Sequence, residues 1–142
     1  MKSKNEVKAM LAQFVREVWD EGKIEASDKY IAPEYTIFHD PGDPWENQTL
    51  DLNTYKERVR KLRAAFPDQH FYIQDMFADE NDIVMTWYWA ATHQGDIPGF
   101  SATGKEIRMS GATAYFLEGG KLTGHWQITD RLDVYPPAQS RG

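Results

Sequence analysis

The sequence contains no cysteine, which excludes disulfide bonds, thiolate nucleophiles and thiolate metal sites. No apolar run approaches the roughly 18 residues that a membrane-spanning helix needs. The amino terminus enters an amphipathic pattern without the apolar segment of a signal peptide. Positive charge is in deficit, with 16 Lys and Arg against 22 Asp and Glu, whereas nucleic-acid binding needs a basic surface. We therefore expect a cytoplasmic protein that binds neither nucleic acid nor a membrane.

Motifs for metals and cofactors are also missing. The segment 93–96 offers one histidine, His93, and one carboxylate, which do not make a metal ligand set. Gly95, Gly99 and Gly104 are spaced as turn residues and do not open a helix, as a phosphate-binding loop does. No serine lies in a nucleophile-elbow sequence. We predict no metal and no cofactor, which leaves acid–base chemistry or ligand binding without chemistry.

Helical patterns fill the first half of the chain, and the length of 142 residues suits one domain, 1–142. Residues 3–6 form a capping-box sequence, and Gly22 is a typical helix stop. Between them, apolar residues follow the i, i+3, i+4, i+7 spacing of an amphipathic helix: Val7, Met10, Leu11, Phe14, Val15, Val18 and Trp19. A shorter helix is predicted at residues 24–30 and a longer one at residues 53–66. The loop 40–48 between them is rich in turn formers, and its Trp45 is either a pocket lid or packed on its neighbours.

Strand patterns fill the second half, after a short strand at residues 35–40. They are predicted at 71–78, 83–93, 107–117 and 120–132, and we expect a mobile tail at 133–142. Helices followed by a meander of strands predict an α+β domain with a curved antiparallel sheet packed on the helices. The strand 83–93 is apolar on both faces, and the second face needs cover. A second copy of the chain is the simplest cover, so we expect a homodimer.

The last strand carries the most informative alternation. Leu122, Trp126, Ile128 and Asp130 share one face, and that face is otherwise apolar. A carboxylate on a core-facing strand position is costly unless paired, and such a group tends to have a raised pKa suited to acid–base work. The alternative is a structural aspartate that caps a turn or pairs with its neighbour. By the same alternation His125 lies on the opposite face.

A set of ordered motifs indicates a family. They are AFPD at residues 65–68, ATHQG at 91–95, ATGK at 102–105 and GKLTGHWQITD at 120–130. In this order they resemble the SnoaL-like polyketide cyclases, also called ester cyclases. The resemblance covers nearly the whole chain, from the first helix to about residue 132.

The resemblance implies the cone-shaped fold of the superfamily of nuclear transport factor two, in which a curved mixed or antiparallel sheet and the helices enclose an apolar pocket. It also implies dimers through the outer sheet face and ring closure by intramolecular aldol condensation, without metal or cofactor. The family's acid/base aspartate corresponds to Asp130. The cyclases add a histidine that the strand 107–117 lacks, so His39 and His93 are the candidates for that role.

We therefore expect a cofactor-independent acid/base enzyme acting on a small hydrophobic carbonyl compound by aldol cyclisation, isomerisation or dehydration. Its catalytic candidates are Asp130, His39 and His93. The pocket is predicted to be lined by Phe14, Tyr35, Trp87 and Trp126, with His39 at its edge. Two alternatives remain: a protein that binds a hydrophobic small molecule without chemistry, and an epoxide hydrolase to which Arg108 and Asp130 supply part of the site.

Overall fold

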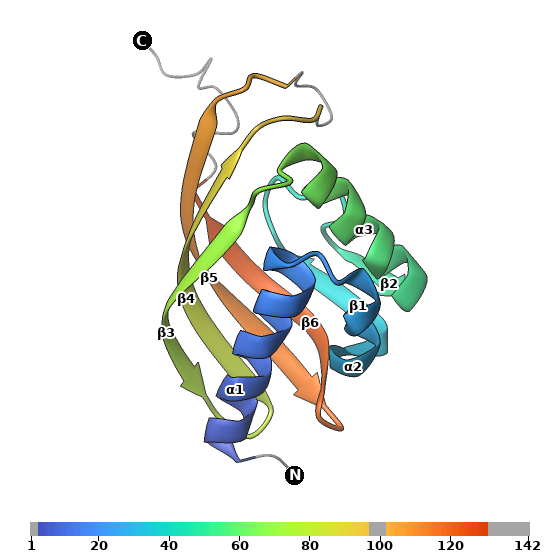
Figure 1. Ribbon diagram of the computed structural model, residues 1–142. Coiled ribbons are helices and arrows are strands. Elements are labelled where there is room, and N and C mark those ends of the chain that lie inside the picture. The colour runs from blue at the N-terminus through green and yellow to red at the C-terminus, as the bar shows by residue number, and fades with distance from the viewer. Residues whose placement is uncertain (1–2, 97–101, 131–142) are drawn as a thin grey trace.

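The computed structural model describes residues 3–96 and 102–130, and the predicted mobile tail lies outside them. Figure 1 shows a curved sheet with the helices on one side of it. The helical elements are α1 (Lys4–Phe14), the π-helix η1 (Val15–Asp20), the 3-10 helix η2 (Ile24–Ala26), α2 (Ser27–Tyr30) and α3 (Leu52–Ala65). The strands are β1 (Ile31–His39), β2 (Gln48–Asp51), β3 (His70–Ala78), β4 (Asp82–Thr92), β5 (Glu106–Glu118) and β6 (Lys121–Thr129).

The sheet has six strands in the order β2-β1-β6-β5-β4-β3. Strands β1 and β6 pair in parallel, and the other neighbours are antiparallel. The sheet is therefore mixed and curved, which confirms the predicted α+β class and agrees with the cone-shaped fold. The parallel pair is the junction that brings the end of β1, early in the chain, beside the last strand.

The helices form where the sequence predicts them, with changes at their ends. The capping box is confirmed, because the Ser3 hydroxyl accepts from the Glu6 N–H at 3.2 Å and the Glu6 carboxylate accepts from the Ser3 N–H at 2.9 Å. The first helix widens into η1 before it stops at Gly22, whose φ is 73°. Helix α3 is capped by Asp51, which accepts from the Thr54 N–H at 2.7 Å. The short polar strand β2 was not predicted.

Two β-bulges decide which side chains face the helices. In β6, Leu122 lies opposite Leu117 and Gly124 lies opposite Phe116, so Thr123 is an extra residue. In β1 the register shifts between Ile37 and His39. An extra residue reverses the alternation beyond it, so His125 rather than Trp126 faces inward. The predicted placement of Trp126, Ile128 and Asp130 on the core-facing side of the strand is therefore wrong.

The two faces of the sheet differ sharply in cover. The inner face packs on the helices, and its fully buried side chains include Phe14 and Leu11 from α1, Tyr35 and Ile37 from β1, and Ile83 and Met85 from β4. The large exposed apolar side chains all lie on the outer face: Phe38, Tyr72, Phe77, Tyr88, Trp126 and Ile128. Within the described residues, no helix is long and apolar enough to cross a membrane.

Candidate functional site

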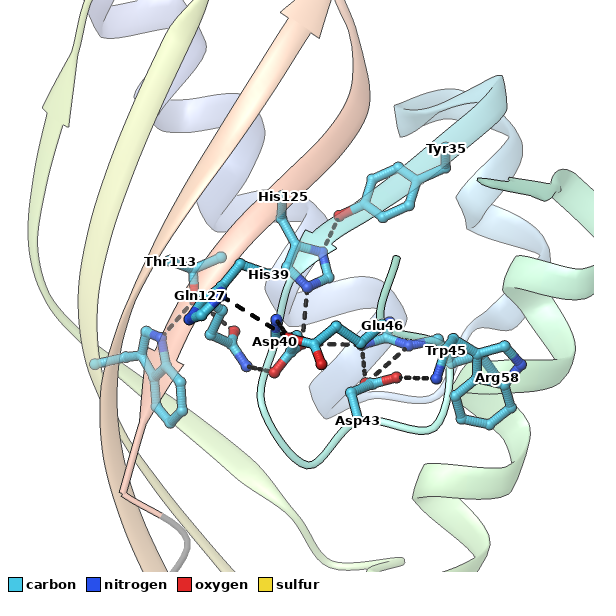
Figure 2. Close-up of polar contacts among 11 residues, drawn as sticks. Tyr35, His39, Asp40, Asp43, Trp45, Glu46, Arg58, Thr113, His125 and Gln127 are labelled. Carbon is cyan, nitrogen blue, oxygen red and sulfur yellow. Dashed lines mark hydrogen bonds and ion pairs between the residues drawn. The ribbon is translucent and has the colours of Figure 1, made fainter. Parts of the chain in front are cut away.

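A buried carboxylate–imidazole pair lies where the end of β1 meets β6 (Figure 2). Asp40 follows β1 and is 0% exposed, and His125 on β6 is 3% exposed. The His125 Nε2 lies 2.8 Å from the Asp40 Oδ2. A buried carboxylate is costly without partners, so this arrangement needs every contact around it. The two bulges described above turn both side chains inward.

The hydrogen bonds of His125 define its protonation state. A carboxylate can only accept, so the Nε2 of His125 donates to Asp40. The other ring nitrogen, Nδ1, is then free to accept from the Tyr35 hydroxyl at 2.6 Å. Burial lowers the pKa of His125 below its ordinary value, although the hydrogen bond to Asp40 acts in the opposite direction. Burial also raises the pKa of Tyr35 well above its ordinary value. The hydrogen-bonded series Tyr35–His125–Asp40 therefore consists of a neutral phenol, a neutral imidazole and a carboxylate.

A second branch reaches Asp40 from β4 and β5. The Gln127 Nε2 donates to the Asp40 Oδ1 at 3.1 Å, and the Gln127 Oε1 accepts from the Thr113 hydroxyl at 2.6 Å. The Thr113 hydroxyl in turn accepts from the Trp87 indole N–H at 2.9 Å. Each donor points along the chain towards Asp40. This fixed direction holds the carboxylate in one orientation, with its oxygens assigned to different partners.

Arg58 on α3 supplies the positive charge of the cluster. Its Nη2 lies 2.9 Å from the Asp43 Oδ2 and 3.7 Å from the Asp40 Oδ2, and its guanidinium lies 5.6 Å from the centre of the Trp19 ring. Burial alone would lower the pKa of Arg58, but Asp43 and its other neighbours raise it above its ordinary value. Two carboxylates share one guanidinium, so the group carries one excess negative charge while His125 is neutral. A proton on His125 would balance that charge.

Aromatic side chains surround the pair on the interior side. The Tyr35 and Tyr55 rings meet edge to face at 4.8 Å, and Tyr115 lies 5.9 Å from the His125 ring and 6.1 Å from the Phe14 ring. Burial raises the pKa of Tyr55 to about 12, and it also raises the pKa of Tyr115. These phenols therefore stay neutral. The surroundings are apolar with a few fixed donors, as in sites for small hydrophobic ligands.

Three of the predicted pocket residues lie in this interior. Phe14, Tyr35 and Trp87 are all buried, and Tyr35 and Trp87 belong to the hydrogen-bonded network. The fourth, Trp126, is 44% exposed on the outer face. It stacks on the predicted catalytic residue His39 with ring centres 4.6 Å apart, and the His39 Nδ1 lies 3.9 Å from the Glu46 carboxylate. The structure thus separates Trp126 and His39 from the other three.

Asp130 and His93 also lie apart from the Asp40–His125 pair. Asp130 is exposed just beyond β6, and its N–H donates to the Ser110 carbonyl at 2.9 Å. Its expected place on the inner face is incorrect, because the bulge at Thr123 reverses the alternation. His93 is buried beyond the end of β4, with its ring 5.3 Å from the Phe66 ring. Its Nδ1 lies 3.3 Å from the Thr103 hydroxyl, and its Nε2 has no hydrogen-bond partner among the described residues.

Sequence reasoning missed the residues that form the network around the carboxylate: Asp40, Arg58, Thr113, His125 and Gln127. The alternation did place His125 and Asp130 on opposite faces, but it assigned the wrong face to the interior. The pattern His39-Asp40 before a rigid loop was the available signal for Asp40. Within residues 3–96 and 102–130, no group of histidine and carboxylate side chains could hold a metal ion.

An open hollow of about 620 Å³ lies elsewhere, between the start of α1 and the turns β3–β4 and β5–β6. Its lining includes Glu6, Glu80 and Glu118. These three carboxylates lie beside Val7 and Leu117, and an acidic lining does not suit an uncharged hydrophobic ligand. The inner network is therefore the better candidate for chemistry.

Comparison with known proteins agrees with this fold. The closely similar structure of a candidate polyketide cyclase from Acidithiobacillus ferrooxidans has 67% sequence identity over 95% of this chain and 94% of that one, with a TM-score of 0.84. Two more distant structures share the fold: a candidate SnoaL-like polyketide cyclase from a Jannaschia species (16% identity, 100% and 99% covered, TM-score 0.81) and AclR, a candidate hydroxylase from Streptomyces galilaeus (20% identity, 93% and 94% covered, TM-score 0.76). No curated protein matches. The sequence model of the SnoaL-like polyketide cyclases matches residues 9–136, and the chain belongs to that family.

Proposed function

We propose that the protein is a cofactor-independent acid/base enzyme that acts on a small hydrophobic carbonyl compound, with His125 and Asp40 as the acid–base pair. Family membership and fold support a cyclase-like role. The observation that carries the assignment is the buried chain from Tyr35 through His125 to Asp40, which is oriented by hydrogen bonds at 2.6 and 2.8 Å. An imidazole held by a carboxylate is a well-established general base, because the carboxylate stabilises the imidazolium that forms.

The proposed reaction begins with a substrate carbonyl group beside Tyr35. The Tyr35 hydroxyl transfers its hydrogen bond from the His125 Nδ1 to the carbonyl oxygen, which frees the Nδ1 lone pair. The Nδ1 then takes a proton from the carbon next to the carbonyl, giving an enolate and an imidazolium. Asp40 stabilises the imidazolium, whose charge balances the excess negative charge of the cluster. Proton transfer by such a base typically contributes about 10²–10⁴-fold to a rate.

Ring closure follows without an oxidant or a reductant. The enolate carbon attacks a second carbonyl carbon of the same substrate, which forms one carbon–carbon bond and leaves an alkoxide. The alkoxide takes the proton back from the His125 Nδ1, so His125 returns to its neutral form. Substrate and aldol product have the same atoms. The aromatic surroundings of Phe14, Tyr55 and Tyr115 favour a substrate with an apolar ring or chain.

The test follows the first proton transfer alone. Alpha-tetralone, a bicyclic aromatic ketone, exchanges the protons beside its carbonyl slowly in neutral D₂O, and proton NMR measures the loss of signal. We expect the protein to accelerate this exchange, and His125→Gln to reduce the acceleration by about 100-fold or more. Asp130→Asn is the matched comparison and is expected to retain the acceleration. Loss in Asp130→Asn with full activity in His125→Gln would overturn our assignment in favour of Asp130. No acceleration by the unaltered protein would favour a binding role.

We also propose that the protein forms a homodimer through the outer face of the sheet. That face exposes the large apolar side chains named above, and small residues such as Ala112 and Ala114 lie between them on β5. A broad apolar sheet face favours association with an identical face about a two-fold axis. The same surface on both copies would then bury Trp126 and Ile128.

A further inference from the structure

The Asp40–His125 pair is closed to solvent, so a substrate reaches it only if a covering segment moves. The carboxylates and the guanidinium are all buried: the Asp40 side chain is 0% exposed, Asp43 4% and Arg58 6%. Asp40 itself is the first residue of the segment 40–47, which joins β1 to β2 and which we call the 40–47 loop. In Figure 2 this loop runs beside the pair and passes from Asp40 through Asp43 to Trp45.

The 40–47 loop is tied together internally. The Asp43 N–H donates to the Asp40 carbonyl at 2.9 Å, and the Asp40 N–H donates to the Glu46 carboxylate at 2.9 Å. The Trp45 N–H donates to the Asp43 Oδ1 at 2.7 Å. Pro41 and Pro44 further restrict the backbone. These bonds close the loop on itself, so it is built to move as one body rather than to unravel.

Both ends of the loop are suited to act as hinges. At the far end, the Asn47 N–H donates to the Ile37 carbonyl at 2.7 Å, where the β1–β2 pairing begins. Asn47 has a φ of 66°, the left-handed region that asparagine tolerates better than most residues. At the near end, the bulge of β1 interrupts the regular pairing with β6 between Ile37 and His39. The loop is thus flanked by two points where the backbone departs from regular strand geometry.

Two side chains tie the loop to α3. Asp43 accepts from the Arg58 Nη2 at 2.9 Å and from its Nε at 3.3 Å, and Lys61 lies 5.9 Å from the centre of the Trp45 ring. The Arg58 Nη2 is closer to the Asp43 carboxylate, at 2.9 Å, than to the Asp40 carboxylate, at 3.7 Å. The guanidinium therefore holds the closed loop and the proposed catalytic carboxylate at the same time.

We propose that the 40–47 loop is the gate of the site and that Asp43 is its latch. The proposal rests on the proposed function of the Asp40–His125 pair. Opening breaks the Asp43–Arg58 contact and moves the Asp43 carboxylate into water. Because Asp40 begins the loop, closing returns its carboxylate to the His125 Nε2 as it restores the Asp43–Arg58 contact.

A single introduced thiol measures this opening without any substrate. The sequence has no cysteine, so Thr113→Cys places one reactive group inside the closed network, where Thr113 is 0% exposed. N-ethylmaleimide, a small uncharged reagent, labels that thiol only when the site opens, and mass spectrometry gives the rate. Asp43→Asn added to Thr113→Cys is expected to raise the labelling rate by roughly 10-fold to 100-fold, because a charged hydrogen bond of the closed state is weakened.

Asp28→Asn on the same Thr113→Cys background is the matched control, because it removes the Asp28–Lys56 ion pair of 2.8 Å from the same helix without touching the loop. Its labelling rate is expected to stay within about twofold of the parent, since the Lys56 ammonium keeps its ion pair with Glu25 at 2.8 Å. The exposed variant Lys61→Met is expected to raise labelling by a smaller factor than Asp43→Asn, and it serves if Asp43→Asn does not fold. Equal rates in parent and latch variants would overturn the proposal. So would labelling that rises steeply with urea, because the thiol would then react only through global unfolding. The labelling rates do not depend on catalysis, so they would still test the gate if the protein did not accelerate alpha-tetralone exchange.

Discussion

The two faces of β6 show opposite chemistry within a few residues of each other. On the inner face, His125 and Gln127 are held by hydrogen bonds to Asp40 at 2.8 and 3.1 Å. On the outer face, Trp126 and Ile128 are large and apolar, yet they are exposed. Buried polar groups and exposed apolar groups both oppose stability in an isolated chain. The difference fits the two roles that we propose for this strand: acid–base chemistry on the inner face and association on the outer face.

Two histidines sharpen this comparison. The inner His125 is bonded at both ring nitrogens, and its pKa is lowered by burial. The outer His39 stacks on Trp126 at a ring distance of 4.6 Å and lies beside Glu46. The sequence pattern favours His39 as a catalytic candidate and places His125 on the strand face opposite Asp130. Only the inner histidine is coupled to a buried carboxylate, which is the arrangement that acid–base chemistry requires.

The largest effect is expected from Arg58→Met, which removes the guanidinium shared by Asp40 and Asp43. Two buried carboxylates would then lose the guanidinium that they share, and we expect a loss of about 3–5 kcal/mol in the free energy of unfolding, measured in urea. Arg60→Met is the matched control on α3, because the Arg60 side chain is 46% exposed. Its cost is expected to stay within about 0.5 kcal/mol. An equal loss of unfolding free energy in both variants would show that the buried ion pairs of Arg58 stabilise the protein no more than the exposed pairs of Arg60.

The outer face is tested by Ile128→Lys, which places a charge in the centre of the apolar surface. We expect the unaltered protein to sediment as a dimer and the variant to sediment near the mass of one chain, 16.4 kDa. The reason is that burying an unpaired ammonium group in an apolar interface is costly. The inner network should remain, so alpha-tetralone exchange per chain is the control. A variant that stays dimeric would place the interface elsewhere.

Much of the fold was predictable because its signals are local. The capping box at Ser3 and Glu6, the apolar stripe of the first helix and the turn before β6 each depend on residues close in sequence. Three of the four predicted pocket residues, Phe14, Tyr35 and Trp87, lie in the interior for the same reason.

The candidate site was not predictable in the same way, because two bulges decide it. Alternation along β6 is reliable only up to Thr123, where one extra residue moves His125 inward and Asp130 outward. Asp40 turns inward beyond the bulge in β1, and its distance of 85 residues from His125 in sequence hides their contact. A single sequence carries no clear mark of a bulge, so the face of each later residue follows only from the pairing of the strands.

Lowering the pH should decrease the free energy of unfolding, because His125 is buried in its neutral form. The unfolded histidine has a pKa of about 6.5, and burial lowers the pKa of His125 in the folded protein. Between these values the unfolded chain binds more protons, so stability is complete above about pH 6.5 and falls as the pH falls, by at most about 1.4 kcal/mol per pH unit. Urea unfolding of the protein and of His125→Gln at several pH values measures this difference. Plotted against pH, the free energies of unfolding of the unaltered protein and of His125→Gln should approach each other as the pH falls. Parallel plots would mean that His125 titrates alike in the folded and unfolded states.

The smallest effect is expected at Asp130, where sequence alternation and structure disagree most directly. Asp130 is exposed, and replacing an exposed carboxylate by an amide of the same shape usually has a small effect on stability. Asp130→Asn should therefore change the free energy of unfolding by no more than about 0.5 kcal/mol. It should also leave the exchange of alpha-tetralone within about twofold of the unaltered protein, because proton transfer is proposed to occur at His125. A folded Asp130→Asn protein that loses exchange would return the acid/base role to this carboxylate and remove it from the inner network.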